Sequence, residues 1–108
     1  MITSIVILTY NNLKYSRLCI ESVRKYTGKD SCEIIVVDNN STDGTVEWLK
    51  DQDDLRVIYN EENMGFPKGC NQGINAARGD DILLLNNDVV VTRSWLDNLK
   101  KCLYSSDD

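Results

Sequence analysis

Four short apolar stretches, each followed by a polar turn and a stretch with helical spacing, constrain the fold of this chain more than any other feature. Their continuous and largely β-branched or leucine-rich character is typical of strands that are buried in a parallel sheet. The expected strands are Ile2–Leu8, Cys32–Val37, Leu55–Tyr59 and Asp81–Leu85. The sequence therefore predicts four β-α units in succession.

The segments between the strands have apolar residues at helical spacing and the stop signals of helices. The expected helices are Leu13–Tyr26, Thr45–Leu49, a segment that follows Gly65-Phe66-Pro67 and closes at Gly79, and a last amphipathic helix from Trp95 through Leu103, capped by Ser94. Val89–Val91 is expected to be extended. This alternation predicts a Rossmann-like α/β fold with a mainly parallel sheet, right-handed crossovers and helices on both faces. Ligands in such a fold bind beyond the carboxyl ends of the strands.

Composition narrows the class of protein. A chain of 108 residues with 42% hydrophobic content is one domain. The net charge of −5 argues against nucleic acid as a partner, and the absence of histidine excludes nucleophile–histidine hydrolases. Four cysteines without a Cys-x-x-Cys pair favour reduced thiols in a cytoplasmic protein. No apolar run has the length of a membrane span, and no signal peptide is recognisable.

Three polar clusters follow the first, second and fourth expected strands, at Thr9–Asn12, Asp38–Asp43 and Asn86–Asp88. Each cluster alone could be ordinary turn chemistry, because Asn, Asp and Ser are frequent in turns for local reasons. All three fall at the same edge of the predicted sheet. This coincidence predicts a ligand site there.

Two carboxylates in these clusters are candidates for ligand contact. Asp38 comes directly after an apolar strand, where it could accept hydrogen bonds from a nucleobase or a ribose hydroxyl. Its alternative is capping of the next helix, although Asn40–Asp43 already offers caps and Asp43 is expected to be structural. Asp88 follows a leucine run and suits Mg²⁺ or Mn²⁺, which bind oxygen ligands and share them with substrate phosphates.

Gly65-Phe66-Pro67-Lys68-Gly69-Cys70-Asn71 opens an expected helix with spaced glycines, where free N–H groups favour a phosphate. The spacing matches neither a P-loop nor a dinucleotide-binding motif. Packing through small residues is an equally good explanation for these glycines.

The ordered set SIVILTYNN, EIIVVDNNSTDGT, NEENMGFPKGCNQGINAARGD and DDILLLNNDVVV resembles glycosyltransferase family 2, most closely its bacterial rhamnosyltransferase-like branch. The resemblance covers essentially the whole chain. It implies a GT-A fold, a nucleoside-diphosphate sugar donor, Mg²⁺ or Mn²⁺, and inverting transfer to a saccharide or lipid-linked acceptor in polysaccharide biosynthesis.

The resemblance also assigns roles to individual residues. Asp38 would bind the base, and Asp88 would bind the metal. Asn86 departs from the first aspartate of the family's Asp-x-Asp form. The other nucleotide-sugar-binding residues would be Thr9, Tyr10, Asn11, Asn40, Asn63, Gly65, Lys68, Gly69, Asn71 and Asn87.

The family's catalytic base lies well downstream of the metal motif, so no catalytic residue is assigned in this chain. The chain is therefore expected to be the N-terminal donor-binding part, residues 1–108, of a longer enzyme and to be inactive alone. A non-catalytic nucleotide-binding module of the same fold is the alternative. A sugar-phosphate nucleotidyltransferase is less favoured, because it would need a glycine-rich basic loop where Thr9–Asn12 stands. Base, sugar, acceptor and oligomeric state stay open.

Overall fold

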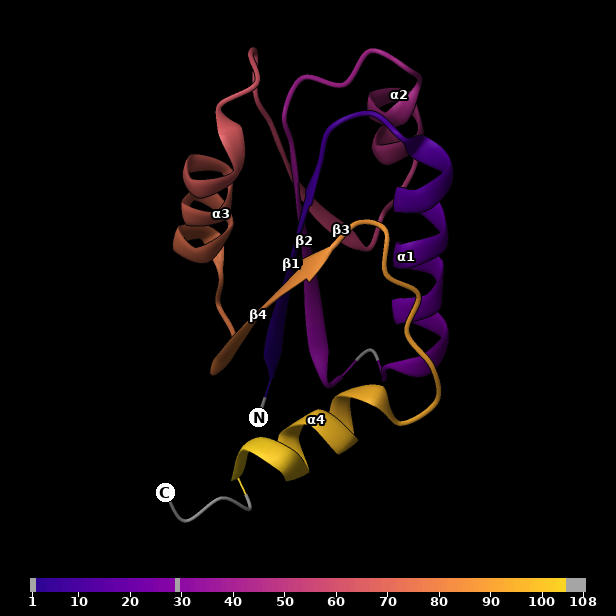
Figure 1. Cartoon of the computed structure of the whole chain (residues 1–108), viewed down its shortest axis with the longest axis vertical. Helices are drawn as coiled ribbons and strands as arrows, with labels where there is room; N and C mark the ends of the chain where they lie inside the picture. The colour runs from indigo at the N-terminus through magenta and orange to yellow at the C-terminus, as the bar shows by residue number, and fades with distance from the viewer. Residues whose placement is uncertain (1, 29, 105–108) are drawn as a thin grey trace.

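The computed structural model, which describes residues 2–28 and 30–104, is a three-layer α/β unit (Figure 1). Helix α3 covers one face of the sheet, α1 and α2 cover the other, and α4 lies across the end at which the strands begin (Figure 1). The elements are β1 (Thr3–Thr9), α1 (Leu13–Tyr26), β2 (Cys32–Asp38), α2 (Thr45–Lys50), β3 (Leu55–Tyr59), α3 (Gly65–Ala76), β4 (Asp81–Asn86) and α4 (Trp95–Tyr104). The predicted alternation of strands and helices is confirmed.

The described strands form one parallel sheet in the order β3-β2-β1-β4. β1 is therefore central, with β2 on one side and β4 on the other. The register pairs Thr9 with Asp38 and Leu8 with Asn86. The strands consequently end together, and the loops that follow them share one edge of the sheet, as the sequence predicted.

The central strands are buried on both faces, which explains their unbroken apolar sequences. Ile5 and Ile7 of β1 pack with α1 in the main core cluster, whereas Val6 lies under α3. α3 can approach β1 closely because Gly69 and Gly73 have no side chains. A Cβ at Gly73 would collide with Val6, and a Cβ at Gly69 would lie 2.5 Å from Leu8 Cδ1. Small residues in α3 therefore serve packing.

The structure differs from the sequence prediction at the strand ends. β1 ends at Thr9, β2 at Asp38 and β4 at Asn86, each one residue later than expected. Backbone pairing explains the extension at two of them, since Asn39 N donates to Thr9 O at 2.9 Å and Asn60 N donates to Asp38 O at 2.9 Å. Polar residues that were assigned to loops are thereby fixed in the sheet.

β4 is less buried than its leucine run suggests. It is an edge of the described sheet, and Ile82 and Leu84 are 45% and 46% exposed. The segment after it, Val89–Val91, joins no described strand and runs beside α1 (Figure 1). Among the helices of the described residues, none combines the length and apolar character needed to cross a bilayer.

Glu33 ties together the edge of the sheet at which the strands begin. Its carboxylate accepts hydrogen bonds from Ser4 Oγ at 2.5 Å, from the backbone N of Arg78 at 2.6 Å and from Arg56 Nη1 at 2.8 Å. Burial raises the pKa of Glu33, but these hydrogen bonds outweigh it and lower the pKa to about 2. The ionised carboxylate thus links β1, β2, β3 and the turn before β4.

The lowered pKa predicts how acid destabilises the fold. Because the folded-state pKa lies below the ordinary value of 4.5, the stabilisation is complete above pH 4.5 and is lost as the pH falls toward 2. Glu33→Gln should lower the free energy of unfolding at neutral pH by on the order of 1–3 kcal/mol and flatten its decrease in acid. Urea unfolding at several pH values measures both effects. Glu21→Gln, at an exposed pair with Arg17, is the control and should change little; an equal acid dependence in Glu33→Gln and the wild type would contradict the assignment.

Candidate nucleotide site

The loops after β1 and β2 are interlocked by hydrogen bonds. Asn11 N donates to Ser41 Oγ at 2.7 Å, and Thr42 N donates to Asn11 Oδ1 at 2.7 Å. Asn11, Asn12 and Asn40 have positive φ angles of 57°, 57° and 68°, which asparagine tolerates better than most residues. The side chain of Asn11 therefore holds the two loops together, while Tyr10 and Asn40 stay exposed at the edge.

Asp43 joins the same interlock in the structural role expected for it. Its carboxylate accepts hydrogen bonds from Leu13 N at 3.0 Å and from Thr45 N at 3.1 Å, at the starts of α1 and α2. Burial raises the pKa of Asp43, but the hydrogen bonds from Thr45 and Leu13 outweigh it and lower the pKa. One aspartate thus caps two helices.

Asp38 is brought to the predicted edge but is completely buried there. Its two oxygens accept hydrogen bonds from Ser41 N at 2.9 Å and from Ser41 Oγ at 2.6 Å. Burial, and next the charge of Asp38, raise the pKa of the neighbouring Tyr59. Each carboxylate oxygen can accept a further hydrogen bond, but the side chain is enclosed in this structure.

A network of side-chain amides fixes the loop between β3 and α3. Buried Asn39 donates through Nδ2 to Gly65 O at 3.3 Å and accepts through Oδ1 from Asn60 Nδ2 at 2.8 Å and from Met64 N at 3.4 Å. Asn60 and Gln72 exchange two further hydrogen bonds, both at 2.8 Å. The end of β2 is thereby tied to the end of β3 and to the start of α3.

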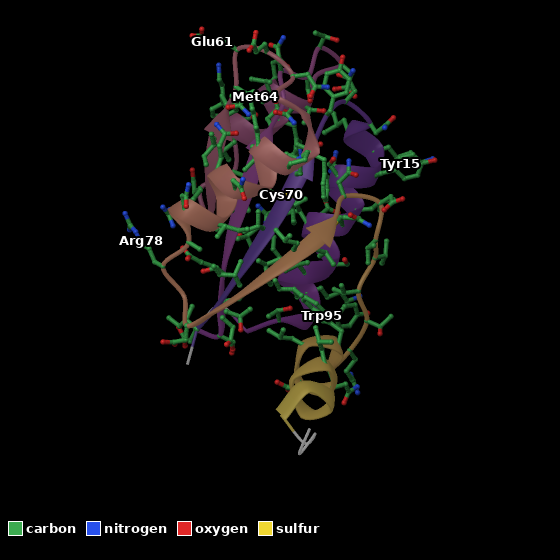
Figure 2. All side chains as sticks on the ribbon, turned by 60° about the vertical axis from the view of Figure 1, so that its left-hand side comes forward. Tyr15, Glu61, Met64, Cys70, Arg78 and Trp95 are labelled. Carbon is green, nitrogen blue, oxygen red and sulfur yellow. The ribbon has the colours of Figure 1, made fainter. Side chains whose placement is uncertain are left out.

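Five predicted site residues lie in the loop before α3 and in the first two turns of that helix. Asn63 Oδ1 accepts the N–H of Gly65 at 2.9 Å, and Gly65 has a φ of 81°, a region that L side chains rarely adopt. Lys68 and Asn71 are exposed, whereas Gly69 is buried against Leu8. Lys68 is therefore available for an anion, and the missing side chain of Gly69 serves helix packing. Figure 2 shows Glu61 and Met64 at this end of the molecule and Trp95 at the other end.

Asn86, Asn87 and Asp88 border a cavity of about 230 Å³ between the end of β4 and α3. Its apolar wall includes Phe66, Cys70 and Leu84. Asp88 is exposed at the edge of the sheet. Thr9, by contrast, is buried, and its hydroxyl lies 2.7 Å from Ser16 Oγ. The structure thus gathers the predicted residues at one edge, with Asp88, Lys68 and Tyr10 exposed and Thr9 and Asp38 enclosed.

The donor set at this edge suits a hard cation that shares its ligands with a phosphate. Among the side chains that the structure describes, which end at residue 99, there is no group of three His, Cys, Asp or Glu able to hold a metal by themselves. The exposed carboxylate of Asp88 beside two asparagines offers oxygen ligands only, which Mg²⁺ and Mn²⁺ prefer. The residues therefore fit a cation whose remaining ligands come from a diphosphate.

A larger cavity of about 390 Å³ lies at the opposite end of the sheet, beside Arg24, Cys32 and Asp54. It borders none of the predicted site residues. Of the predicted reduced cysteines, Cys19 and Cys70 are buried thiols. Burial raises the pKa of both. The pKa of Cys19 rises to about 11, and the negative charge of Asp88 is the second cause of that rise. The side chain of Cys102 lies outside the described part of the chain.

The residues that position the site could not be identified from the sequence. Ser16, Asn39, Asn60 and Gln72 have hydrogen bonds that depend on partners distant in the chain. Their only sequence signal is polarity inside otherwise apolar or turn-like segments, and that signal does not name a partner. Ser41 was considered only as a helix cap, whereas it binds Asp38 and Asn11.

A parallel α/β unit with polar loops converging at the carboxyl edge of the sheet is the architecture of nucleotide-binding folds. The profile of Glycosyl transferase family 2 matches residues 4–105, and the chain belongs to that family. The predicted family is thus confirmed.

Relatives support this membership. Glycosyltransferase GlyG of Streptococcus pneumoniae is 31% identical over 96% of this chain and 36% of its own length. An uncharacterised glycosyltransferase of Methanocaldococcus jannaschii, MJ1057, is 35% identical over 99% of this chain and 39% of its own length. This chain therefore spans somewhat more than a third of these two relatives.

Solved structures confirm the GT-A fold. S. aureus TarS 1-349 in complex with UDP-GlcNAc superposes with a TM-score of 0.81 and 30% identity, over 97% of this chain and 32% of that chain. The mannosyltransferase PcManGT from Pyrobaculum calidifontis, in complex with GDP-Man and Mn²⁺, gives a TM-score of 0.82 and 25% identity, over 94% of this chain and 32% of that chain.

The amide network predicts a specific loss of order when Asn39 is replaced. Asn39→Ala leaves Asn60, Gly65 and Met64 with unpaired polar groups, so the free energy of unfolding should fall by about 1–3 kcal/mol. Hydrogen exchange at the amide of Met64 should accelerate more than exchange in β1. Asn71→Ala, an exposed site on α3, is the matched control; equal effects of the two variants would contradict the network's role.

Proposed function

We propose that this chain is the donor-binding part of a glycosyltransferase and that it holds a nucleoside-diphosphate sugar at the carboxyl edge of its sheet. The observation that carries the proposal is the convergence of the loops after all four strands on the edge where Asp88 and Lys68 are exposed. The complexes of TarS with UDP-GlcNAc and of PcManGT with GDP-Man support a ligand of this class.

The roles of the residues follow from their chemistry and exposure. Tyr10 and Asn40 would border the nucleotide, and Asp38 would accept hydrogen bonds from the base. Lys68 and the start of α3 would face the diphosphate, where positive charge and the helix end favour an anion. The remaining contributors would be Thr9, Asn11, Asn63, Gly65, Gly69, Asn71 and Asn87, several of them by shaping the loops.

Asp88 would hold a divalent cation, Mg²⁺ or Mn²⁺, together with oxygens of the diphosphate. When bound, the cation supplies charge neutralisation for the diphosphate that leaves the sugar. The presence of Mn²⁺ in the PcManGT complex supports this assignment.

We further propose that transfer is inverting and that the acceptor is a saccharide or a lipid-linked sugar. A general base must then take the proton of the acceptor hydroxyl. At the edge of the sheet, Asp38 is buried and bonded to Ser41, and Asp88 is assigned to the cation. Because this chain spans little more than a third of its relatives, we assign the base and the acceptor site to regions that the match does not cover.

Calorimetric titration with UDP, GDP and dTDP, each with and without Mn²⁺, tests donor binding. We expect one nucleotide to bind, and Asp88→Asn to weaken its metal-dependent binding by about tenfold or more, by analogy with hydrogen bonds to charged groups, which contribute on the order of 1.5–3 kcal/mol. Asp97→Asn, at an exposed aspartate of α4, is the control. A folded chain that binds none of the nucleotides would overturn the proposal.

A pair of variants separates the two possible roles of Asp38. Asp38→Asn removes the charge, whereas Ser41→Ala removes the hydrogen bond that holds the turn and keeps the carboxylate. If Asp38 contacts the base, Asp38→Asn should weaken nucleotide binding more than Ser41→Ala does in the same titration. Equal weakening would assign Asp38 to the turn alone. Hydrolysis of a nucleotide sugar that depends on Mn²⁺ would, in addition, separate an enzyme part from a non-catalytic nucleotide-binding module.

A further inference from the structure

A row of small polar residues on α1 holds the segment that carries Asp88. Ser16, Cys19 and Ser22 lie three residues apart, on one buried face of the helix. Asn87 Nδ2 donates to Ser16 Oγ at 3.1 Å, Cys19 Sγ donates to Asn86 O at 3.6 Å, and Val91 N donates to Ser22 Oγ at 3.0 Å. The chain after β4 therefore runs along α1 and is bonded to it at each turn of the helix (Figure 1).

Ser16 differs from the other two members because it binds a side chain that borders the cavity. Ser16 Oγ lies 2.7 Å from Thr9 Oγ1, which in turn lies 3.4 Å from Asn11 O. Asn87 donates to Ser16, because an amide nitrogen can only donate. Hydrogen bonds thus link Asn87 through Ser16 and Thr9 to the loop after β1.

The hydrogen bond from Asn87 to Ser16 fixes which end of the Asn87 amide faces away from α1. The NH₂ group is bound to completely buried Ser16, and the oxygen lies at the opposite end of the same planar amide. Asn87 also lines the cavity beside Asp88. The carbonyl oxygen of this amide, which is not engaged in the bond to Ser16, is therefore the acceptor that Asn87 can offer to a ligand.

We propose that Ser16 is a positioning residue that holds the amide of Asn87 with its oxygen toward the cavity, where it receives a ribose hydroxyl or the divalent cation of the bound donor. The cation needs an oxygen ligand, and a ribose hydroxyl can donate to the same oxygen. With Asn86 in place of a carboxylate, a fixed neutral oxygen beside Asp88 supplements the single negative charge. The proposal rests on the proposed donor site, and its test separates the two.

The first arm of the test uses the protein without ligand. In ¹⁵N-labelled wild type, the side-chain amide signals of Asn87 should differ from those of exposed asparagines, and Ser16→Ala should shift them toward the exposed positions. Ser22→Ala removes a comparable buried hydroxyl from the same row and should leave them in place. Unchanged Asn87 signals in Ser16→Ala would overturn the inference, whether or not the chain binds nucleotides.

The second arm measures affinities for UDP, GDP and their dideoxy forms, with and without Mn²⁺. Ser16→Ala should reduce one of two ratios by about fivefold. A smaller gain in affinity from Mn²⁺ would identify the cation as the partner of the Asn87 oxygen. A smaller preference for the hydroxylated nucleotide would identify the ribose hydroxyl as that partner. Ser22→Ala should keep both ratios. Equal losses in the two variants, or none in Ser16→Ala, would overturn the positioning role.

If the wild type binds no nucleotide, the proposed function fails, and the first arm still decides the orientation of Asn87. If Ser16→Ala does not fold, Ser16→Cys, with a similar volume and a weaker acceptor, replaces it.

Discussion

The pairing of β1 with β2 on one side and β4 on the other is the constraint on which the rest of the structure depends. It sets Thr9 against Asp38 and Leu8 against Asn86, so three polar segments end at one level. A slip of one residue in either pairing would turn every side chain of that strand to the opposite face. The apolar surfaces under α1 and α3 prevent such a slip, and core packing thereby determines where the polar loops meet.

The fold could be predicted from the sequence because its strands and helices are encoded locally. Unbroken apolar runs and helical spacing identify the elements, and α1 and β3 have the predicted boundaries. β1, β2 and β4 each end one residue later than predicted, and for β1 and β2 hydrogen bonds from neighbouring segments explain the extension. The exposure of Ile82 and Leu84 could not be predicted from the sequence either, because a leucine run does not reveal which strand lies at an edge of the sheet.

The candidate site was predictable as a place but not as a set of contacts. Polarity after three strands was sufficient to locate the edge. It could not show that Asn11, Asp38 and Thr9 bind other loop or helix residues, because Ser16 and Ser41 lie far from some of their partners in sequence. An asparagine that fixes a loop and one that contacts a ligand have the same local sequence signal. Only the tertiary structure separates them.

Burial divides the polar residues of the edge into two groups with different consequences for charge. The buried ones neutralise backbone groups and add no attraction for an anion. Lys68 is the cation at the start of α3, in a chain whose net charge is −5. A diphosphate brought to this edge would face the carboxylate of Asp88 at short range, and repulsion between like charges in a partly enclosed site is costly. Under the proposed function, a divalent cation held by Asp88 would reverse the sign of that interaction, so Asp88 would favour donor binding only with metal bound.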